Sequence, residues 1–321
     1  MSARGAAPRA TPRPPRSSYS DLVRIVIAGG TGFLGRPLAA GLARHGHEVQ
    51  ILTRRTGPLP AGLVSWQPDG TAGPWASALD QMDGVVNLAG AEMAGRRWTE
   101  ARKRELRESR MLATRSLIAA MQVVTARPRV FVSQSGVGYY GPRGDEEIGE
   151  HEPRGGDFVA GMAGDWEAEA ARAGDMGARL VVLRTGLVLA RDGGALAQML
   201  LPFRFGLGGR LGSGRQYVPW IHRRDWIDLV RWSLVSEKVH GTLNATAPNP
   251  VTNREFTAAL GRALRRPAIV PVPAFALRLA FGELADAVLT GQRAVPRRAL
   301  ALGFHFRWPL LGPALADVLT R

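Results

Sequence analysis

Cysteine is absent from this chain of 321 residues. Its absence excludes disulfide bonds, thiolate nucleophiles and cysteine-ligated metals. No other cluster of metal-ligating side chains stands out, so we expect no metal site. The chain also lacks an apolar run of about 18 residues or more, which excludes a transmembrane helix. A reducing compartment is compatible with this composition, and we predict a cytoplasmic location.

Lysine is nearly absent as well. Only Lys103 and Lys238 occur, so 40 of the 42 basic residues are arginine, and the net charge is +15. Such a charge suits a nucleic acid or an anionic membrane, whereas a codon bias toward arginine explains it without a partner. We favour the codon bias, because the arginine pairs are scattered among acidic residues and prolines. We therefore expect no nucleic-acid or membrane partner, and a small anionic ligand suits the charge.

Residues 1–20 form a segment of distinct composition. They contain four arginines, four prolines and no acidic residue, which predicts a disordered tail. A mitochondrial presequence is also rich in arginine, but the prolines oppose the amphipathic helix that it requires. We divide the rest into a nucleotide-binding domain at 21–186 and a smaller lobe at 187–321.

Apolar runs alternate with amphipathic segments from Arg24 onward. We expect buried strands at 24–28, 48–53, 85–89, 129–133, 179–185 and 241–245. We expect helices at 32–44, 99–121, 161–173 and 193–203, after His222, and after Thr252, where Glu255 completes a capping box. This alternation predicts an α/β fold: a Rossmann-type doubly wound parallel sheet with a smaller, mostly helical C-terminal lobe interleaved with its last strands.

A glycine-rich turn, GGTGFLG at 29–35, joins the first strand to the first helix. Glycines at this spacing allow a tight turn and let the backbone approach a pyrophosphate, while the helix N-terminus offers free N–H groups. NAD sites place an acidic residue after the second strand. Here Thr53, Arg54 and Arg55 stand at that point. Because a guanidinium pairs well with phosphate, NADP(H) is favoured, with Arg54 on the 2′-phosphate.

These pieces resemble the extended short-chain dehydrogenase/reductase superfamily, and more closely its atypical epimerase-family branch of nucleoside-diphosphate-sugar epimerase-like proteins. Further matching pieces are NLAGA, RRW, SGVGYYG, LRTGLVL, LPFRFGLGG, WIHRRD and GQRAVPRRALALGF. The resemblance covers roughly residues 24–318 and implies a Rossmann fold, NADP and a characteristic C-terminal lobe. It also implies cofactor contacts at Gly29, Thr31, Gly32, Phe33, Leu34, Gly35, Thr53, Arg54, Leu88, Ala89, Glu105, Arg110 and Val188.

The catalytic pair of that superfamily is missing. Active members use a tyrosine as general acid/base, with a lysine four residues later that lowers its pKa, because a phenol is otherwise a poor base at neutral pH. The segment where the pair belongs, GGDFVAGMAGDWEAEA, has neither residue, and Phe158 is its nearest aromatic. Ser135 matches the substrate-orienting serine, and we name Ser135 and Tyr140 as catalytic candidates.

Three functions stay open. The protein is an NADP-dependent oxidoreductase or epimerase that uses other groups, such as Tyr139, Tyr140, Asp157 or Glu167. Alternatively, it binds NADP(H) without turnover as a redox sensor or scaffold, or it is a basic interaction protein with a structural cofactor. We favour the first, acting on a small anionic molecule such as a nucleotide sugar.

A second glycine-rich stretch supports the expectation of an anionic substrate. The loop at 206–214 is expected near the sheet edge, with Arg204, Arg210 and Arg215 beside it. Its backbone N–H groups suit an anion. His222 and Asp225 follow, and a lone histidine of this kind is more often structural than catalytic. The oligomeric state is left open.

Overall fold

A computed structural model describes residues 23–94 and 96–320. The predicted tail at 1–20 lies outside these residues. Seven parallel strands form the central sheet in the order β11-β7-β5-β4-β1-β2-β3. Their bounds are β1 (Arg24–Ala28), β2 (Glu48–Thr53), β3 (Leu63–Ser65), β4 (Gly84–Asn87), β5 (Val130–Gly136), β7 (Arg179–Thr185) and β11 (Gly241–Ala245). The strand order reverses between β1 and β4, where such sheets bind ligands.

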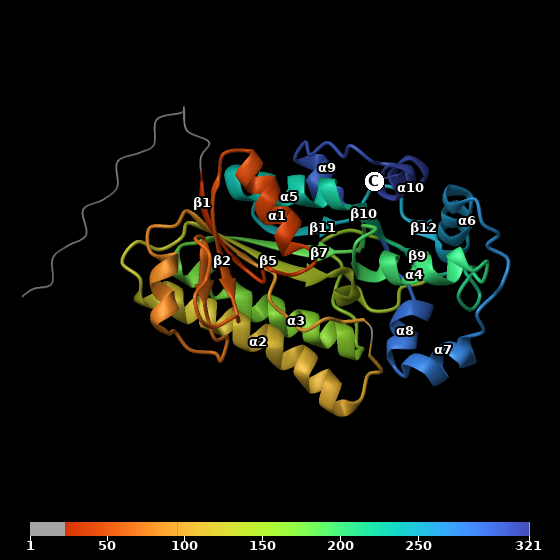
Figure 1. The fold of residues 1–321 in the computed structure, drawn as a ribbon, viewed down its shortest axis with the longest axis horizontal. Helices are drawn as coiled ribbons and strands as arrows, with labels where there is room; N and C mark the ends of the chain where they lie inside the picture. Colours follow the sequence, from red (N-terminus) through yellow and green to blue (C-terminus); the bar gives the residue numbers. More distant parts are fainter. Residues whose placement is uncertain (1–22, 95, 321) are drawn as a thin grey trace, which may run out of the picture.

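Helices cover both faces of the sheet, which confirms the doubly wound fold (Figure 1). They are α1 (Gly35–Arg44) and α5 (Arg223–Val235) on one face, and α2 (Glu100–Val123) and α3 (Phe158–Ala171) on the other. Strand β1 shows why the sheet needs helices on both faces. Side chains point alternately to the two faces along a strand, and those of β1 are apolar on both. Ile25 and Ile27 enter the core beneath α1 and α5, whereas Val26 and Ala28 enter the core beneath α2.

The C-terminal lobe has its own apolar core, in which Trp220, Phe256 and Leu260 are fully buried. Its helices are α4 (Gly194–Arg204), α6 (Asn253–Leu264), α7 (Ala274–Phe281), α8 (Leu284–Leu289), α9 (Arg297–Ala301) and α10 (Leu311–Thr320). Three strand pairs accompany them: β8 (Leu187–Leu189) with β10 (Trp220–His222), β9 (Tyr217–Val218) with β12 (Val251–Thr252), and β6 (Glu147–Ile148) with β13 (Arg293–Ala294). Strand β11 returns to the central sheet, and the boundary at 186 stays a prediction.

Three short 3₁₀ helices complete the elements: η1 (Pro74–Leu79), η2 (Val137–Tyr140) and η3 (Gly174–Met176). Two predicted helix starts were misplaced by three residues. Helix α1 begins at Gly35 rather than 32, because the preceding residues form the turn. Helix α3 begins at Phe158 rather than 161, because the Asp157 carboxylate caps it by accepting the Ala160 N–H at 2.7 Å. No helix in the described part of the chain is long and apolar enough to cross a bilayer.

Candidate nucleotide-binding site

The glycine turn lies at the point where the strand order reverses. Gly29 has φ +79°, and a Cβ there would stand 2.8 Å from the carbonyl carbon of Leu88. A Cβ on Gly35 would stand 2.2 Å from the Gly29 oxygen. The Gly32 N–H donates to that same oxygen at 3.0 Å. The turn therefore accepts no side chain at these positions, which brings its backbone close to β4 and to the start of α1.

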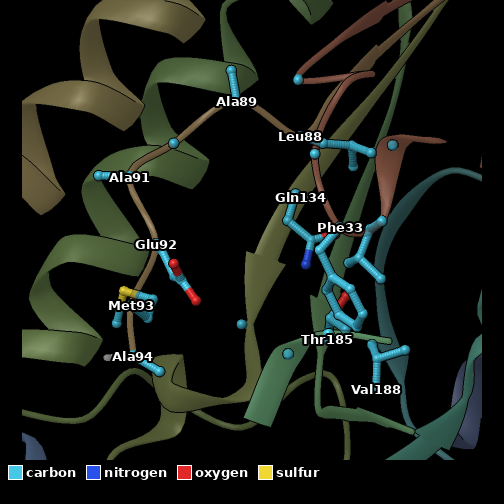
Figure 2. A pocket seen from close by; sticks show the side chains of 18 of the residues that line it. Phe33, Leu88, Ala89, Ala91, Glu92, Met93, Ala94, Gln134, Thr185 and Val188 are labelled. Atoms are coloured by element: carbon cyan, nitrogen blue, oxygen red, sulfur yellow. The ribbon is translucent and has the colours of Figure 1, made fainter. Parts of the chain in front are cut away.

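A cavity of about 930 Å³ opens beside this turn. Figure 2 shows the segment from Ala91 to Ala94 along one side, and Leu88, Phe33, Gln134, Thr185 and Val188 across from it. Twelve of the residues named from the sequence line the cavity: Gly29, Thr31, Gly32, Phe33, Leu34, Gly35, Arg54, Leu88, Ala89, Arg110, Ser135 and Val188. Their contact with a cofactor stays a prediction, but the fold gathers them around one space.

Thr53 and Glu105 do not line the cavity. Thr53 is buried beneath it, where its hydroxyl accepts the Arg55 N–H at 3.3 Å. Glu105 is exposed on α2 and pairs with Arg102 at 2.6 Å. That hydrogen bond, with the nearby charges of Arg102, Arg96 and Arg54, lowers the pKa of the Glu105 carboxyl. Glu105 therefore belongs to the charged rim around Arg54 rather than to the cavity wall.

A buried hydrogen-bond network supports the turn after β4, and its partners lie far from that turn in the sequence. Asn87 donates to the Thr114 hydroxyl at 2.9 Å and accepts the Ala89 N–H at 3.2 Å. The indole of Trp166 donates to the same hydroxyl at 3.0 Å. Helices α2 and α3 thus fix the backbone that faces Gly29. Asn87 and Trp166 belonged to motifs in the sequence, NLAGA and WE, whereas Thr114 did not.

Arg110 projects from α2 into the cavity wall. Its guanidinium donates to the carbonyls of Leu106 at 2.8 Å and Ala91 at 3.1 Å, and lies 5.2 Å from the Trp166 ring. Burial, with the nearby charge of Arg102, lowers the pKa of Arg110 to about 10. The side chain therefore stays cationic at neutral pH and brings a positive charge to an otherwise apolar part of the wall.

Helix α3 presents an apolar face to the cavity. Val159, Met162, Ala163 and Trp166 line it. Residues three and four apart on a helix share a face, so a tyrosine and a lysine four residues apart would project from here. Instead, no tyrosine or lysine is among the described residues that line the cavity. The part of the cavity wall where the catalytic tyrosine and lysine would lie is therefore apolar.

Ser135 lies at the end of β5, and its hydroxyl donates to Glu167 at 2.6 Å. The Glu167 carboxylate is held from the other side by Arg184, whose Nε and Nη2 donate at 2.9 and 2.7 Å. Arg184 is 4% exposed, and its guanidinium carbon lies 3.3 Å from the centre of the Tyr139 ring. A bidentate ion pair between an arginine and a carboxylate fixes the orientation of both side chains. Ser135 is therefore oriented by a buried charge pair.

Tyr140 does not lie where a catalytic phenol is required. It is fully buried and does not line the cavity. Its hydroxyl donates to Asn244 at 2.7 Å and accepts from Arg184 at 3.0 Å. Burial raises the pKa of Tyr140 to about 12. The hydroxyl therefore links η2 to β11 and holds its proton at neutral pH.

The other candidates also hold the fold together. Asp157 caps α3, as described above. The ring of His222 stacks on Trp308 at 3.7 Å and its Nε2 lies 3.2 Å from Asp317, while Asp225 accepts the Trp308 N–H at 3.0 Å. Burial raises the pKa of Asp225. Neither side chain lines the cavity; both fasten the last part of the chain to α5.

The loop at 206–214 is also absent from the cavity wall. It packs against the segment before α7 instead, where Val272 donates its N–H to the carbonyl of Arg210 at 2.9 Å. A Cβ on Gly209 would stand 1.9 Å from the Val270 oxygen. The glycines thus allow two backbone segments to meet, and the expected anion site beside Arg204, Arg210 and Arg215 loses its support.

Comparison with known proteins agrees with this geometry. Residues 25–245 match the NAD dependent epimerase/dehydratase family. The chain belongs to that family. A second match, at 272–318, is to a domain of unknown function, DUF1731. Within the family, the epimerase family protein SDR39U1 of mouse is 42% identical over 302 residues, which are 93% of this chain and 100% of the mouse protein.

Two solved structures of relatives are similar in fold. Human epimerase family protein SDR39U1 (isoform2), solved with NADPH, is 40% identical with a TM-score of 0.86, covering 92% of this chain and 99% of the human one. The nucleoside-diphosphate sugar epimerase from Corynebacterium glutamicum is 33% identical with a TM-score of 0.76, covering 93% of this chain and 58% of the other. The family resemblance inferred from the motifs is therefore confirmed.

Proposed function

We propose that the protein binds NADPH at the glycine turn and acts as an NADP(H)-dependent oxidoreductase or epimerase on a small molecule. The observation that carries the proposal is the turn itself, where the Gly29 and Gly35 positions leave no space for a Cβ beside a large cavity. Arg54 lines the same cavity beyond β2, where a 2′-phosphate requires a cation. The human relative contains NADPH, and we assign the same ligand here.

A bound nicotinamide supplies hydride transfer. The residues of this chain orient the ligand beside it, and Ser135 is the polar group best placed to do so. Because its proton is donated to Glu167, the Ser135 oxygen has only lone pairs to offer the cavity. It therefore accepts a hydrogen bond from a ligand hydroxyl, and a carbonyl oxygen finds no donor there. Arg184 keeps Glu167 in this orientation through two hydrogen bonds.

The substrate is proposed as a hydroxyl-bearing molecule, with a nucleotide sugar as one form. The cationic residues on the cavity wall are Arg36, Arg54 and Arg110, and we assign these to the phosphates of the bound molecules. The α3 face adds apolar contacts. Action in the cytoplasm remains part of the proposal, supported by the absence of cysteine.

Binding without turnover is the second candidate. It is favoured by the α3 face, which offers no phenol or ammonium to the cavity, and by Tyr140, whose hydroxyl is engaged away from it. General acid–base groups contribute about 10²–10⁴-fold to such reactions. A protein lacking them is suited to report the NADPH/NADP⁺ ratio to a partner.

Titration with NADPH and with NADH tests the cofactor assignment. We expect tighter binding of NADPH, and Arg54→Ala should weaken NADPH about 10- to 100-fold while leaving NADH unchanged, since one charge-assisted phosphate contact contributes about 1.5–3 kcal/mol. Arg55→Ala is the matched control, because Arg55 is also exposed but does not line the cavity. Equal binding of the two nucleotides would contradict the assignment.

Turnover separates the two candidates. Wild-type protein with NADP⁺ is offered a panel of sugar nucleotides and simple alcohols. The absorbance of NADPH follows net oxidation of a substrate, and chromatography of the sugar nucleotides follows epimerisation, which returns the hydride and leaves no net NADPH. For an enzyme, Ser135→Ala should lower the rate at least tenfold without changing NADPH affinity. No turnover with any compound, combined with different protease cleavage patterns in NADPH and NADP⁺, would favour the sensor.

A further inference from the structure

The end of the molecule formed by α4 and α7 exposes large apolar side chains. Six of them, which we call the apolar face, are between 58% and 79% exposed: Leu201, Phe205, Leu207, Ile269, Phe275 and Leu279. Helix α7 turns Phe275 and Leu279, four residues apart, toward solvent while it buries Leu277. Contiguous apolar surface outside a core marks an interaction site.

Two chain segments build this face, and backbone hydrogen bonds join them. The N–H of Val270 donates to Gly208 at 3.1 Å, and that of Val272 donates to Arg210 at 2.9 Å. The chain that follows α4 and the chain that precedes α7 therefore lie side by side. Figure 1 shows α4, α7 and α8 together at the end of the molecule opposite β2.

The same two segments carry charge of one sign. Neither 193–224 nor 256–282 contains an aspartate or glutamate. Together they contain nine arginines: Arg204, Arg210, Arg215, Arg223, Arg224, Arg262, Arg265, Arg266 and Arg278. Two of these pair with acids outside the segments, Arg223 with Asp192 and Arg278 with Asp286. The two segments that carry the apolar face are thus strongly basic, which favours a partner that offers both apolar and anionic groups.

We propose that the apolar face docks on the surface of an anionic lipid bilayer. Amphipathic helices with phenylalanine and leucine on one face and arginine beside them insert into the boundary between headgroups and acyl chains. Each arginine near an anionic membrane strengthens binding about fivefold. The proposal is independent of the NADPH assignment, since no residue of the apolar face lines the cavity.

Other occupants fit the face less well. A second copy on the same face would bring the same basic segments against each other, and like charges oppose such an interface. Single-stranded nucleic acid prefers aromatic platforms for its bases, whereas four of the six apolar residues are aliphatic. A bilayer satisfies both the aliphatic side chains and the basic segments.

Vesicle co-sedimentation with the full chain tests the proposal. We use phosphatidylcholine vesicles with and without phosphatidylglycerol, and expect binding only to the anionic ones, weakening as salt is raised. The double variant Phe275→Ser/Leu279→Ser should weaken binding at least tenfold, because two side chains no longer enter the bilayer. Arg265→Gln/Arg266→Gln should weaken it about 25-fold at low salt. NADPH affinity should stay unchanged in all variants.

Val123→Ser is the matched control, since Val123 is 66% exposed at the end of α2, away from the apolar face. The proposal is overturned if wild type fails to sediment with anionic vesicles, or if Val123→Ser loses as much binding as the α7 double variant. It is also overturned if a single-stranded oligonucleotide binds more tightly and its binding is lost in the α7 variant, because the face then serves nucleic acid.

Discussion

The two ends of the cavity are built on opposite principles. At the glycine end, backbone atoms approach so closely that side chains are excluded, as at Gly29 and Gly35. At the other end, Ser135, Glu167 and Arg184 form a buried polar chain in which each side chain holds the next. The first end depends on glycines that have no side chain, and the second depends on hydrogen bonds between charged and polar side chains. A substitution therefore acts differently at each.

The arginines show the same contrast. Arg54 is exposed at the cavity rim, whereas Arg184 is 4% exposed and makes two hydrogen bonds to Glu167. Removal of an exposed cation changes what is bound, and removal of a buried one leaves an unpaired charge that destabilises the fold. We therefore expect the rim to govern nucleotide selection, and the buried pair to govern folding and the orientation of Ser135.

The largest effect is expected from Gly35→Ala. The added Cβ meets backbone atoms at 2.2 and 2.5 Å, so the turn must move and NADPH binding should fall more than 100-fold by fluorescence titration. Gly161→Ala is the control, because a Cβ there meets no atom outside its own helix backbone within 4 Å and Gly161 does not line the cavity. In α3 that change should stabilise the protein by about 0.5–1 kcal/mol. Equal NADPH affinity in both variants would contradict the inference that the glycine turn accepts no side chain at Gly35.

Arg184→Met should come next. Loss of one partner from a buried ion pair destabilises by about 3–5 kcal/mol, measured by urea denaturation. Arg115→Met is its counterpart, since Arg115 on α2 pairs at 2.9 Å with Glu169 on α3, the helix that also carries Glu167, but is half exposed. That loss should stay below about 1 kcal/mol. If the two variants are equally stable, Arg184 and Glu167 do not form the buried pair inferred here.

The smallest effect is expected from Tyr140→Phe. At neutral pH the lost hydrogen bonds should destabilise by about 1–2 kcal/mol. In the folded protein the pKa is raised to about 12 by burial, above about 10 for a free phenol. The unfolded chain therefore releases this proton first as pH rises, and wild-type stability should fall between pH 10 and 12. The variant should lack that part of the decline, and identical alkaline curves would contradict the burial of the phenol.

The glycine end of the cavity could be predicted from the sequence because its residues are close together along the chain. The strand, the turn and the helix follow one another, and Arg54 comes directly after the next strand. The polar end depends on distant partners: Tyr140 meets Asn244, 104 residues away. Tyr140 was therefore named as catalytic because it lies within the matched motif SGVGYYG, although in the fold its hydroxyl is buried against Asn244. The Asn87 network was hidden for the same reason, since its partners lie on α2 and α3.

The basic segments also could not be recognised from the order of residues along the chain. Arginine pairs that are scattered along the chain formed no stripe in the sequence, and no membrane partner was expected from them. The fold joins two segments without acidic residues through backbone hydrogen bonds at Val270 and Val272. The segments 193–224 and 256–282 are brought together only by the fold, so the order of arginines along the chain does not reveal their combined charge.

Strand β11 has a consequence for synthesis of the protein on the ribosome. It pairs with β7 in a register that joins Gly241 to Val181. Strand β7 therefore cannot complete its hydrogen bonds until β11, about 60 residues later in the chain, has been synthesised. Until then β7 presents an open edge, and the partner of Tyr140 does not yet exist. Distant pairings of this kind slow folding and leave the nascent chain open to aggregation. We therefore expect chaperones to bind nascent chains that end between β7 and β11, and to release them once Asn244 has emerged.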